Sequence, residues 1–139
     1  AAPLDLERPY ADTEALLGLS AFNITADGHR RRFLLYVPGR RSEAKIPLWI
    51  LAPGWGDTAE RMLTISGLVE SAEKHNFAFV ALEGKFRMMN VVLRGRASDK
   101  LPDDVKYTRR VLQQVVGKVN VDRRQIKCVG FSRGARFCS

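Results

Sequence analysis

Residues 130–134, Gly-Phe-Ser-Arg-Gly, are the feature that most narrows what this chain can fold into. The pattern Gly-x-Ser-x-Gly is typical of a nucleophile elbow, a sharp strand-to-helix turn that exposes the serine hydroxyl. Gly130 and Gly134 suit such a turn because glycine has no Cβ atom to collide across it. The motif therefore predicts Ser132 as a nucleophile, with a strand before it and a helix after it.

A β-hairpin is predicted near the start of the chain. Asp27 and Gly28 form a dipeptide typical of two-residue hairpin turns, and residues 21–26 and 31–37 flank it with strand-like composition. Residues 1–20 contain no clear periodic element, so we expect them to form a surface arm. The sheet is therefore expected to open with an antiparallel pair.

Three short apolar runs follow the hairpin. They cover residues 47–52, 77–82 and 126–131. Their apolar residues are largely continuous rather than alternating, which is typical of parallel strands covered on both faces. Residues 84–100 are polar and basic without a clear period, and we expect a surface loop there.

Helical patterns fill the intervals between these runs. One covers residues 58–75, with a break near Ser66 and Gly67. Another begins at Pro102, a good first-turn residue, and we interpret Asp103 and Asp104 as charges that complement the helix dipole. This alternation of strands and helices predicts an α/β fold, with a mostly parallel sheet and right-handed crossovers.

A serine nucleophile also needs backbone N–H groups that stabilise the oxyanion of the tetrahedral intermediate. The amide of Arg133, directly after the serine, is one candidate. Residues 53–57, Pro-Gly-Trp-Gly-Asp, follow the third expected strand, and the amide of Trp55 is the second candidate. Gly54 and Gly56 would let this loop approach a substrate closely.

Several stretches together resemble the secreted feruloyl esterase and polyhydroxybutyrate depolymerase group of α/β-hydrolases. They are residues 32–38, 53–56, 103–105, 121–126 and 130–135. The resemblance covers about residues 30–137, and its most specific part is residues 121–135. It implies a serine carboxylesterase that needs no cofactor and hydrolyses cinnamoyl-sugar esters, polyesters or related acyl esters. It also implies an acyl-enzyme at Ser132 and an oxyanion hole made by the amides of Trp55 and Arg133.

In α/β-hydrolases the catalytic acid and histidine follow the serine in the chain. Here only residues 135–139 follow the motif, and the two histidines, His29 and His75, precede it. We therefore expect residues 21–139 to be the N-terminal part of one α/β-hydrolase domain, with residues 1–20 as its arm. The Asp or Glu and the histidine are expected from a second polypeptide or a cleaved C-terminal segment, so the enzyme would act as a two-chain complex.

Composition excludes several other classes. The net charge of +8 arises from 23 basic and 15 acidic residues, but the basic residues are spread as doublets without interleaved aromatics. We therefore expect no nucleic-acid partner. No apolar run approaches the roughly 20 residues that span a bilayer, so no membrane span is expected. Two histidines and two cysteines at these spacings predict no metal site.

Two weaker signals favour an extracellular protein. The sequence starts with Ala-Ala-Pro rather than methionine, as a processed chain would. Asn23, Ile24 and Thr25 form an N-glycosylation sequon, which makes Asn23 a candidate glycan site. Secretion is the resulting expectation.

The two cysteines are expected not to pair with each other. Cys128 lies on the strand before the elbow and Cys138 on the helix after it. Layers of secondary structure pack about 10 Å apart, whereas disulfides need Cα atoms within about 7 Å. Cys138 is therefore a candidate for a disulfide to a residue outside this chain.

Two other functions fit the same residues. A serine peptidase or amidase of the same superfamily would use the same elbow, because the motif does not distinguish esters from amides. A non-catalytic binding subunit could keep the scaffold without its chemistry, because fold does not dictate function.

Overall fold

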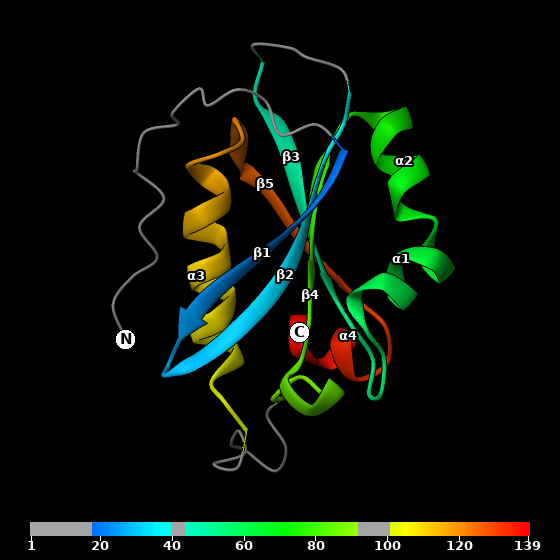
Figure 1. Ribbon diagram of the computed structural model, residues 1–139. Helices are drawn as coiled ribbons and strands as arrows, with labels where there is room; N and C mark the ends of the chain where they lie inside the picture. The colour runs from blue at the N-terminus through cyan, green and yellow to red at the C-terminus, as the bar shows by residue number, and fades with distance from the viewer. Residues whose placement is uncertain (1–17, 40–43, 92–100) are drawn as a thin grey trace.

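The computed structural model describes residues 18–39, 44–91 and 101–139 of the chain. These residues form a mixed five-stranded sheet in the order β1-β2-β4-β3-β5 (Figure 1). The strands are β1 (Gly18–Ala26), β2 (His29–Val37), β3 (Ile46–Ala52), β4 (Ala78–Leu82) and β5 (Val121–Gly130). The helices are α1 (Ala59–Ser66), α2 (Leu68–His75), η1 (Lys85–Arg87), α3 (Asp104–Val116) and α4 (Arg133–Cys138). The predicted α/β class is confirmed.

The predicted hairpin joins β1 to β2. Asp27 and Gly28 have φ angles of 53° and 76°, as the two central residues of a type I′ turn require. β1 begins at Gly18 rather than at Ala21, so residues 18–20 belong to the sheet and not to the expected surface arm. The rest of that arm, residues 1–17, lies outside the described residues.

Both faces of the sheet are covered, with α1 and α2 on one side and α3 on the other (Figure 1). Side chains alternate along β4, so Val80 and Leu82 join the core under α3 while Phe79 and Ala81 join the core under α1 and α2. All five residues of β4 are buried. This arrangement explains the continuous apolar runs, because a strand covered on both faces has no polar side. Strand β4 pairs in parallel with β3, and β3 with β5, as predicted.

The helix boundaries follow local signals. The break predicted near Ser66 and Gly67 is confirmed, because Gly67 with a φ of 64° ends α1 before α2 begins. Asp103 caps α3 by accepting a hydrogen bond from the Lys106 amide at 3.0 Å. Asp104 was expected to serve only as a helix-dipole charge, but it is buried and forms an ion pair, described below.

The prediction of a surface loop at residues 84–100 is wrong for the first half of that range. Residues 84–91 include the short helix η1, and Met89, Asn90 and Val91 are buried. Met89 and Val91 belong to the core under α3. This segment has no helical or strand period because it is irregular, and its residues 89–91 lie in the interior of the fold. Residues 92–100 lie outside the described residues.

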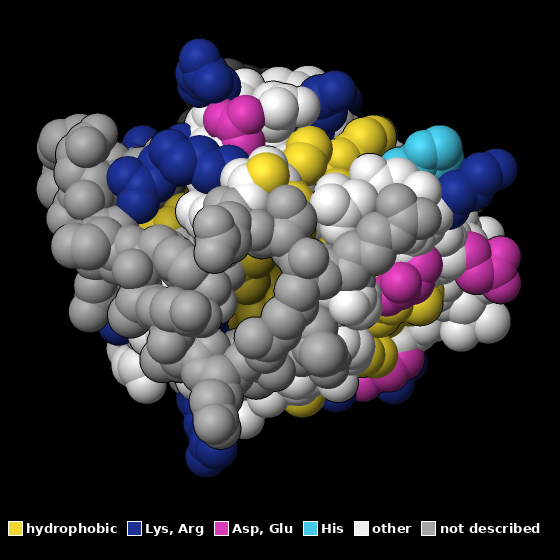
Figure 2. Space-filling view, turned by 90° about the horizontal axis from the view of Figure 1, so that it is seen from above, with side chains coloured by type: hydrophobic (Ala, Val, Ile, Leu, Met, Phe, Trp, Pro, Cys, Tyr) yellow, Lys and Arg dark blue, Asp and Glu magenta, His cyan; other side chains and the backbone are white. Residues whose placement is uncertain are grey.

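Charged side chains do not gather into one basic stripe on the face shown in Figure 2. This view looks onto the amino ends of the parallel strands, and Lys and Arg side chains are scattered there among acidic and apolar ones. Within the described ranges, no helix combines the length and apolar character needed to cross a membrane.

Candidate active site

The elbow motif forms a tight strand-to-helix turn. β5 ends at Gly130, α4 begins at Arg133, and Ser132 between them has φ 55° and ψ −111°. A non-glycine residue with such a φ is strained and is held there only by the surrounding structure. Ser132 is exposed, and its hydroxyl has no hydrogen-bond partner among the described residues. The turn therefore presents a free serine hydroxyl at the carboxyl end of the sheet.

The two elbow glycines are required by close backbone packing. A Cβ atom at Gly134 would lie 2.1 Å from the Ala52 carbonyl oxygen, and one at Gly130 would lie 2.1 Å from the Gly134 carbonyl carbon. Side chains almost never tolerate such contacts with backbone atoms, which cannot rotate away. The glycines thus let α4 pack directly on β5 and on the end of β3.

We expect Gly134→Ala to lower the free energy of unfolding by about 3 kcal/mol or more, because overpacking here would push backbone against backbone. Urea unfolding followed by circular dichroism measures this. Gly117→Ala is the matched control, since a Cβ there would lie 3.5 Å from the Gln114 carbonyl oxygen, in ordinary contact. The control should change stability by less than about 1 kcal/mol. Equal effects of the two substitutions would contradict the packing argument.

The predicted oxyanion loop lies against the elbow. The Phe131 amide donates to the Ala52 carbonyl at 3.3 Å, and a Cβ at Gly54 would lie 3.1 Å from the Phe131 carbonyl oxygen. The backbone amides of Trp55 and Arg133 have no acceptor among the described residues. The structure thus brings Ser132 and both candidate amide donors to one end of the sheet.

The backbone of Gly56 is engaged within the fold. Its amide donates to the Arg87 carbonyl at 2.7 Å and is therefore already occupied. Its φ of 80° lies in the region that favours glycine. Gly56 thus ties the loop after β3 to the segment after β4.

Segment 84–91 supports the elbow. This supporting role was not predicted from the sequence. Arg133 Nε donates to the Met89 carbonyl at 2.7 Å, so the side chain of the residue after Ser132 is anchored on this segment. The signal that could have revealed it is the apolar content of residues 86–93, which includes Met88, Met89 and Val91.

A buried ion pair and its hydrogen bonds also hold segment 84–91 in place. Arg31 Nη1 lies 2.8 Å from Asp104 Oδ1, and both side chains are almost fully buried. The Asn90 amide donates to the other oxygen of Asp104, and Arg31 Nη2 donates to the Glu83 carbonyl at 2.9 Å. The Arg31 guanidinium also stacks 3.8 Å from the centre of the Tyr107 ring. Burial raises the pKa of the Asp104 carboxyl, while the Asn90 amide and Arg31 act against that shift.

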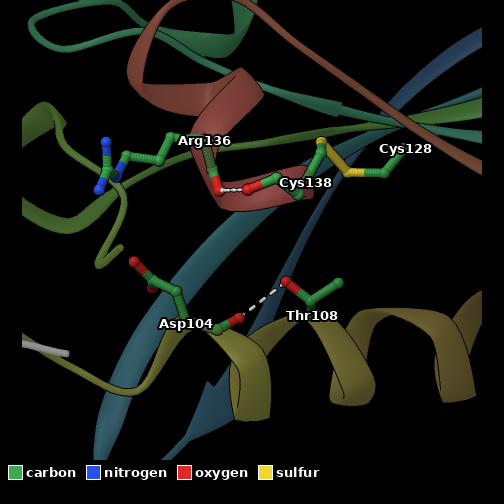
Figure 3. Close-up of a disulfide and its surroundings, with 6 residues drawn as sticks. Asp104, Thr108, Cys128, Arg136 and Cys138 are labelled. Atoms are coloured by element: carbon green, nitrogen blue, oxygen red, sulfur yellow. Dashed lines mark hydrogen bonds between the residues drawn. A yellow bond between two sulfur atoms is a disulfide. The ribbon is translucent and has the colours of Figure 1, made fainter. Parts of the chain in front are cut away.

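The cysteine prediction is wrong, because Cys128 and Cys138 form a disulfide with each other (Figure 3). Their Cα atoms lie 5.5 Å apart, well inside the usual limit. The expected layer spacing of about 10 Å assumes side chains on both surfaces. Here Gly130 and Gly134 bring α4 onto β5 without intervening Cβ atoms, so the cysteines meet. Cys138 is therefore not available for a bridge to another segment.

We expect loss of this disulfide to lower the free energy of unfolding by about 2–3 kcal/mol, as for a loop of this length. The Cys128→Ser/Cys138→Ser variant should show this in urea unfolding. Dithiothreitol should destabilise the wild-type protein by a similar amount and leave the double variant unchanged. A wild-type protein that is insensitive to the reductant, while free-thiol titration shows complete reduction, would contradict the prediction.

Neither histidine is placed to act as base for Ser132. His75 ends α2 just before β4 begins, so it lies at the amino ends of the parallel strands, opposite the elbow. His29 opens β2 at the hairpin, and β4 and β3 stand between β2 and β5 in the sheet. That neither histidine is catalytic remains a prediction. Among the described residues, no group of three or more His, Cys, Asp or Glu side chains could hold a metal ion.

The candidate glycan site is accessible. Asn23 lies on the edge strand β1 and is exposed. It stands opposite Arg32 in the hairpin register. Nothing in the geometry prevents a glycan from being attached there, and glycosylation remains a prediction.

Known proteins with similar sequence or fold include esterases and another hydrolase. The chain is 30% identical over 133 residues to a protein of Nocardia uniformis subsp. tsuyamanensis named "Putative esterase NocK", a match that covers 91% of this chain and 37% of that protein. A thermostable esterase superposes with a TM-score of 0.66 at 17% identity, covering 84% of this chain and 35% of the other. The S-formylglutathione hydrolase FrmB of Staphylococcus aureus superposes with a TM-score of 0.66 at 12% identity, covering 86% and 49%. No family model matches the chain.

The chain therefore shares the fold of these solved hydrolases and is similar in sequence to the Nocardia protein over 133 residues. The chain spans about a third to a half of the length of the proteins it matches. The structural matches are below 25% identity and show the fold alone.

Proposed function

We propose that this chain carries the nucleophile of a serine carboxylesterase, with Ser132 forming the acyl-enzyme. The observation that carries the proposal is the strained, exposed Ser132 between β5 and α4, with an unoccupied hydroxyl. Strain of this kind persists where a function requires it, and the nucleophile elbow is the recognised case for serine.

In this reaction the Ser132 oxygen attacks the ester carbonyl carbon, and a base takes the hydroxyl proton. The amides of Trp55 and Arg133 would donate to the oxyanion that develops. Collapse of the intermediate breaks the carbon–oxygen bond to the alcohol, which leaves with the proton. Water then attacks the acyl-enzyme in the same manner and releases the acid.

We propose that the base and its orienting carboxylate come from outside this chain, on a second polypeptide or a cleaved C-terminal segment. The positions of His29 and His75 support this, because neither approaches the elbow. Intact mass measured under native and then denaturing conditions tests the arrangement. A catalytically active preparation containing only one 15.6 kDa chain would contradict it.

For the substrate we propose a feruloyl or related aromatic ester, or a polyester. The sequence resemblance supports this class. Trp55 and Phe131, which flank the site on either loop, are 70% and 60% exposed and offer an aromatic surface to the acyl group. A panel of methyl ferulate, methyl acetate and a short polyester should show the highest kcat/KM for the aromatic ester or the polyester.

Covalent labelling tests the nucleophile directly. A fluorophosphonate should modify Ser132 and no other serine in the assembled protein, as located by peptide mass spectrometry. Prior unfolding is the control and should abolish labelling, because reactivity depends on the folded site. Labelling at a different serine, or none in a preparation that hydrolyses esters, would contradict the proposal.

The same preparation separates the alternatives. An amidase would cleave peptide anilides as well as the matched esters, whereas a carboxylesterase would cleave the esters alone. A binding subunit would neither be labelled nor hydrolyse either substrate. We also propose that the protein is secreted and glycosylated at Asn23. Digestion with peptide N-glycosidase should then lower the mass by one glycan and convert Asn23 to aspartate.

A further inference from the structure

A second feature at the carboxyl end of the sheet is a basic hollow of about 700 Å³. Its lining comes from β1, β2, the start of α1 and the segment after β4. The residues are Asn23, Arg30, Arg31, Arg32, Thr58, Glu83, Gly84, Lys85 and Arg87. Its volume lies in the range of small-molecule sites.

The charges in this hollow do not cancel. Arg31 is neutralised by Asp104, and Arg32 by Glu60 and Glu83. The remaining three cations have no carboxylate partner among the described residues: Arg30, Lys85 and Arg87. Like charges gathered in a concave surface repel each other and concentrate anions from solution.

The hollow and the elbow are joined by one loop. At its beginning, Gly54 lies against the Phe131 carbonyl of the elbow, and at its end Thr58 lines the hollow. Between these points the Gly56 amide binds the carbonyl of Arg87, which also lines the hollow. A ligand in the hollow would therefore lie beside the loop proposed to stabilise the oxyanion.

We infer that this hollow binds an anion, a carboxylate or phosphate group, through Arg30, Lys85 and Arg87. The anion is either the charged end of an ester substrate or a separate small molecule. The substrate case rests on the proposed esterase function, whereas anion binding itself does not. Guanidinium and ammonium groups form charge-assisted hydrogen bonds to such anions.

Isothermal titration calorimetry with citrate and with inorganic phosphate tests the site. The protein should be free of glycan, because Asn23 lines the hollow. Arg30→Gln/Lys85→Gln should raise the Kd for citrate at least tenfold. The matched control Lys74→Gln/Arg110→Gln removes the same charges from exposed positions on α2 and α3 and should change Kd less than twofold. No saturable binding, or equal weakening by both pairs, would overturn the inference.

Two esters of one acid then distinguish the source of the anion. Phenyl acetate is neutral, and 4-acetoxybenzoate carries a carboxylate on the same leaving group. If Arg30→Gln/Lys85→Gln lowers kcat/KM at least tenfold for 4-acetoxybenzoate alone, the anion is part of the substrate. If citrate binding is lost while both esters react as before, the hollow binds a separate anion. Failure of the esterase proposal would show as no hydrolysis of phenyl acetate, with calorimetry unaffected.

Discussion

Replacing Ser132 by alanine is expected to lower kcat for ester hydrolysis by about 10⁶-fold, the loss seen when a triad nucleophile is removed. The physical reason is that no other group can form the acyl-enzyme at this turn, so only water attack assisted by the oxyanion donors remains. Alanine also carries a Cβ atom, so the strain at φ 55° is unchanged and the fold should persist. Steady-state rates with a nitrophenyl ester, measured in the assembled protein, provide the test.

Ser139→Ala is the matched control for this substitution. Ser139 is exposed, and its hydroxyl donates to the Arg136 carbonyl at the end of α4, away from the elbow turn. The Ser139→Ala substitution should change kcat for ester hydrolysis less than twofold. An active Ser132→Ala variant would remove the catalytic interpretation and leave the binding-subunit alternative.

Replacing Asp104 by alanine is expected to lower the free energy of unfolding by about 3–5 kcal/mol, because it leaves Arg31 charged, buried and unpaired. The Asn90 amide would also lose its acceptor. Asp103→Ala is the matched control on the adjacent position. This substitution removes only an exposed helix cap and should lower the free energy of unfolding by about 1 kcal/mol.

A double-mutant cycle in urea unfolding isolates the ion pair. Arg31→Met/Asp104→Leu removes both charges and should be less destabilising than the sum of its two single substitutions, because no uncompensated charge remains. Additive effects of the two substitutions would show that the pair does not couple.

Because this pair fixes the segment that anchors Arg133, the Asp104→Ala variant should also label more slowly with fluorophosphonate.

The elements that could be predicted from sequence are those set by neighbours in the chain. Asp27 and Gly28 alone can specify the hairpin turn, since its φ angles are a local property. The continuous apolar run of β4 indicated a strand covered on both faces, and both faces are covered. The glycine at 67 ends one helix for the same local reason.

The features that were predicted wrongly depend on contacts between residues distant in the chain. Residues 89–91 are buried only because α3 packs over Met89 and Val91 and because Asp104 accepts a hydrogen bond from the Asn90 amide. Asp104 looks like a helix-dipole charge in sequence, and only the packing of α3 against β2 brings Arg31 to it. No periodicity in either stretch carries that information.

The sequence by itself determined that a strand, a strained serine and a helix follow one another from residue 126 to residue 138, because glycine spacing controls which backbone turns are sterically possible. Only the tertiary structure decided how closely that helix lies on the sheet. The Gly130 and Gly134 contacts replace the usual layer spacing with backbone contact, and this brings Cys128 to Cys138. It also decided what surrounds Ser132, because the loops after β3 and β4 meet the elbow through parallel strand pairing that no local pattern encodes.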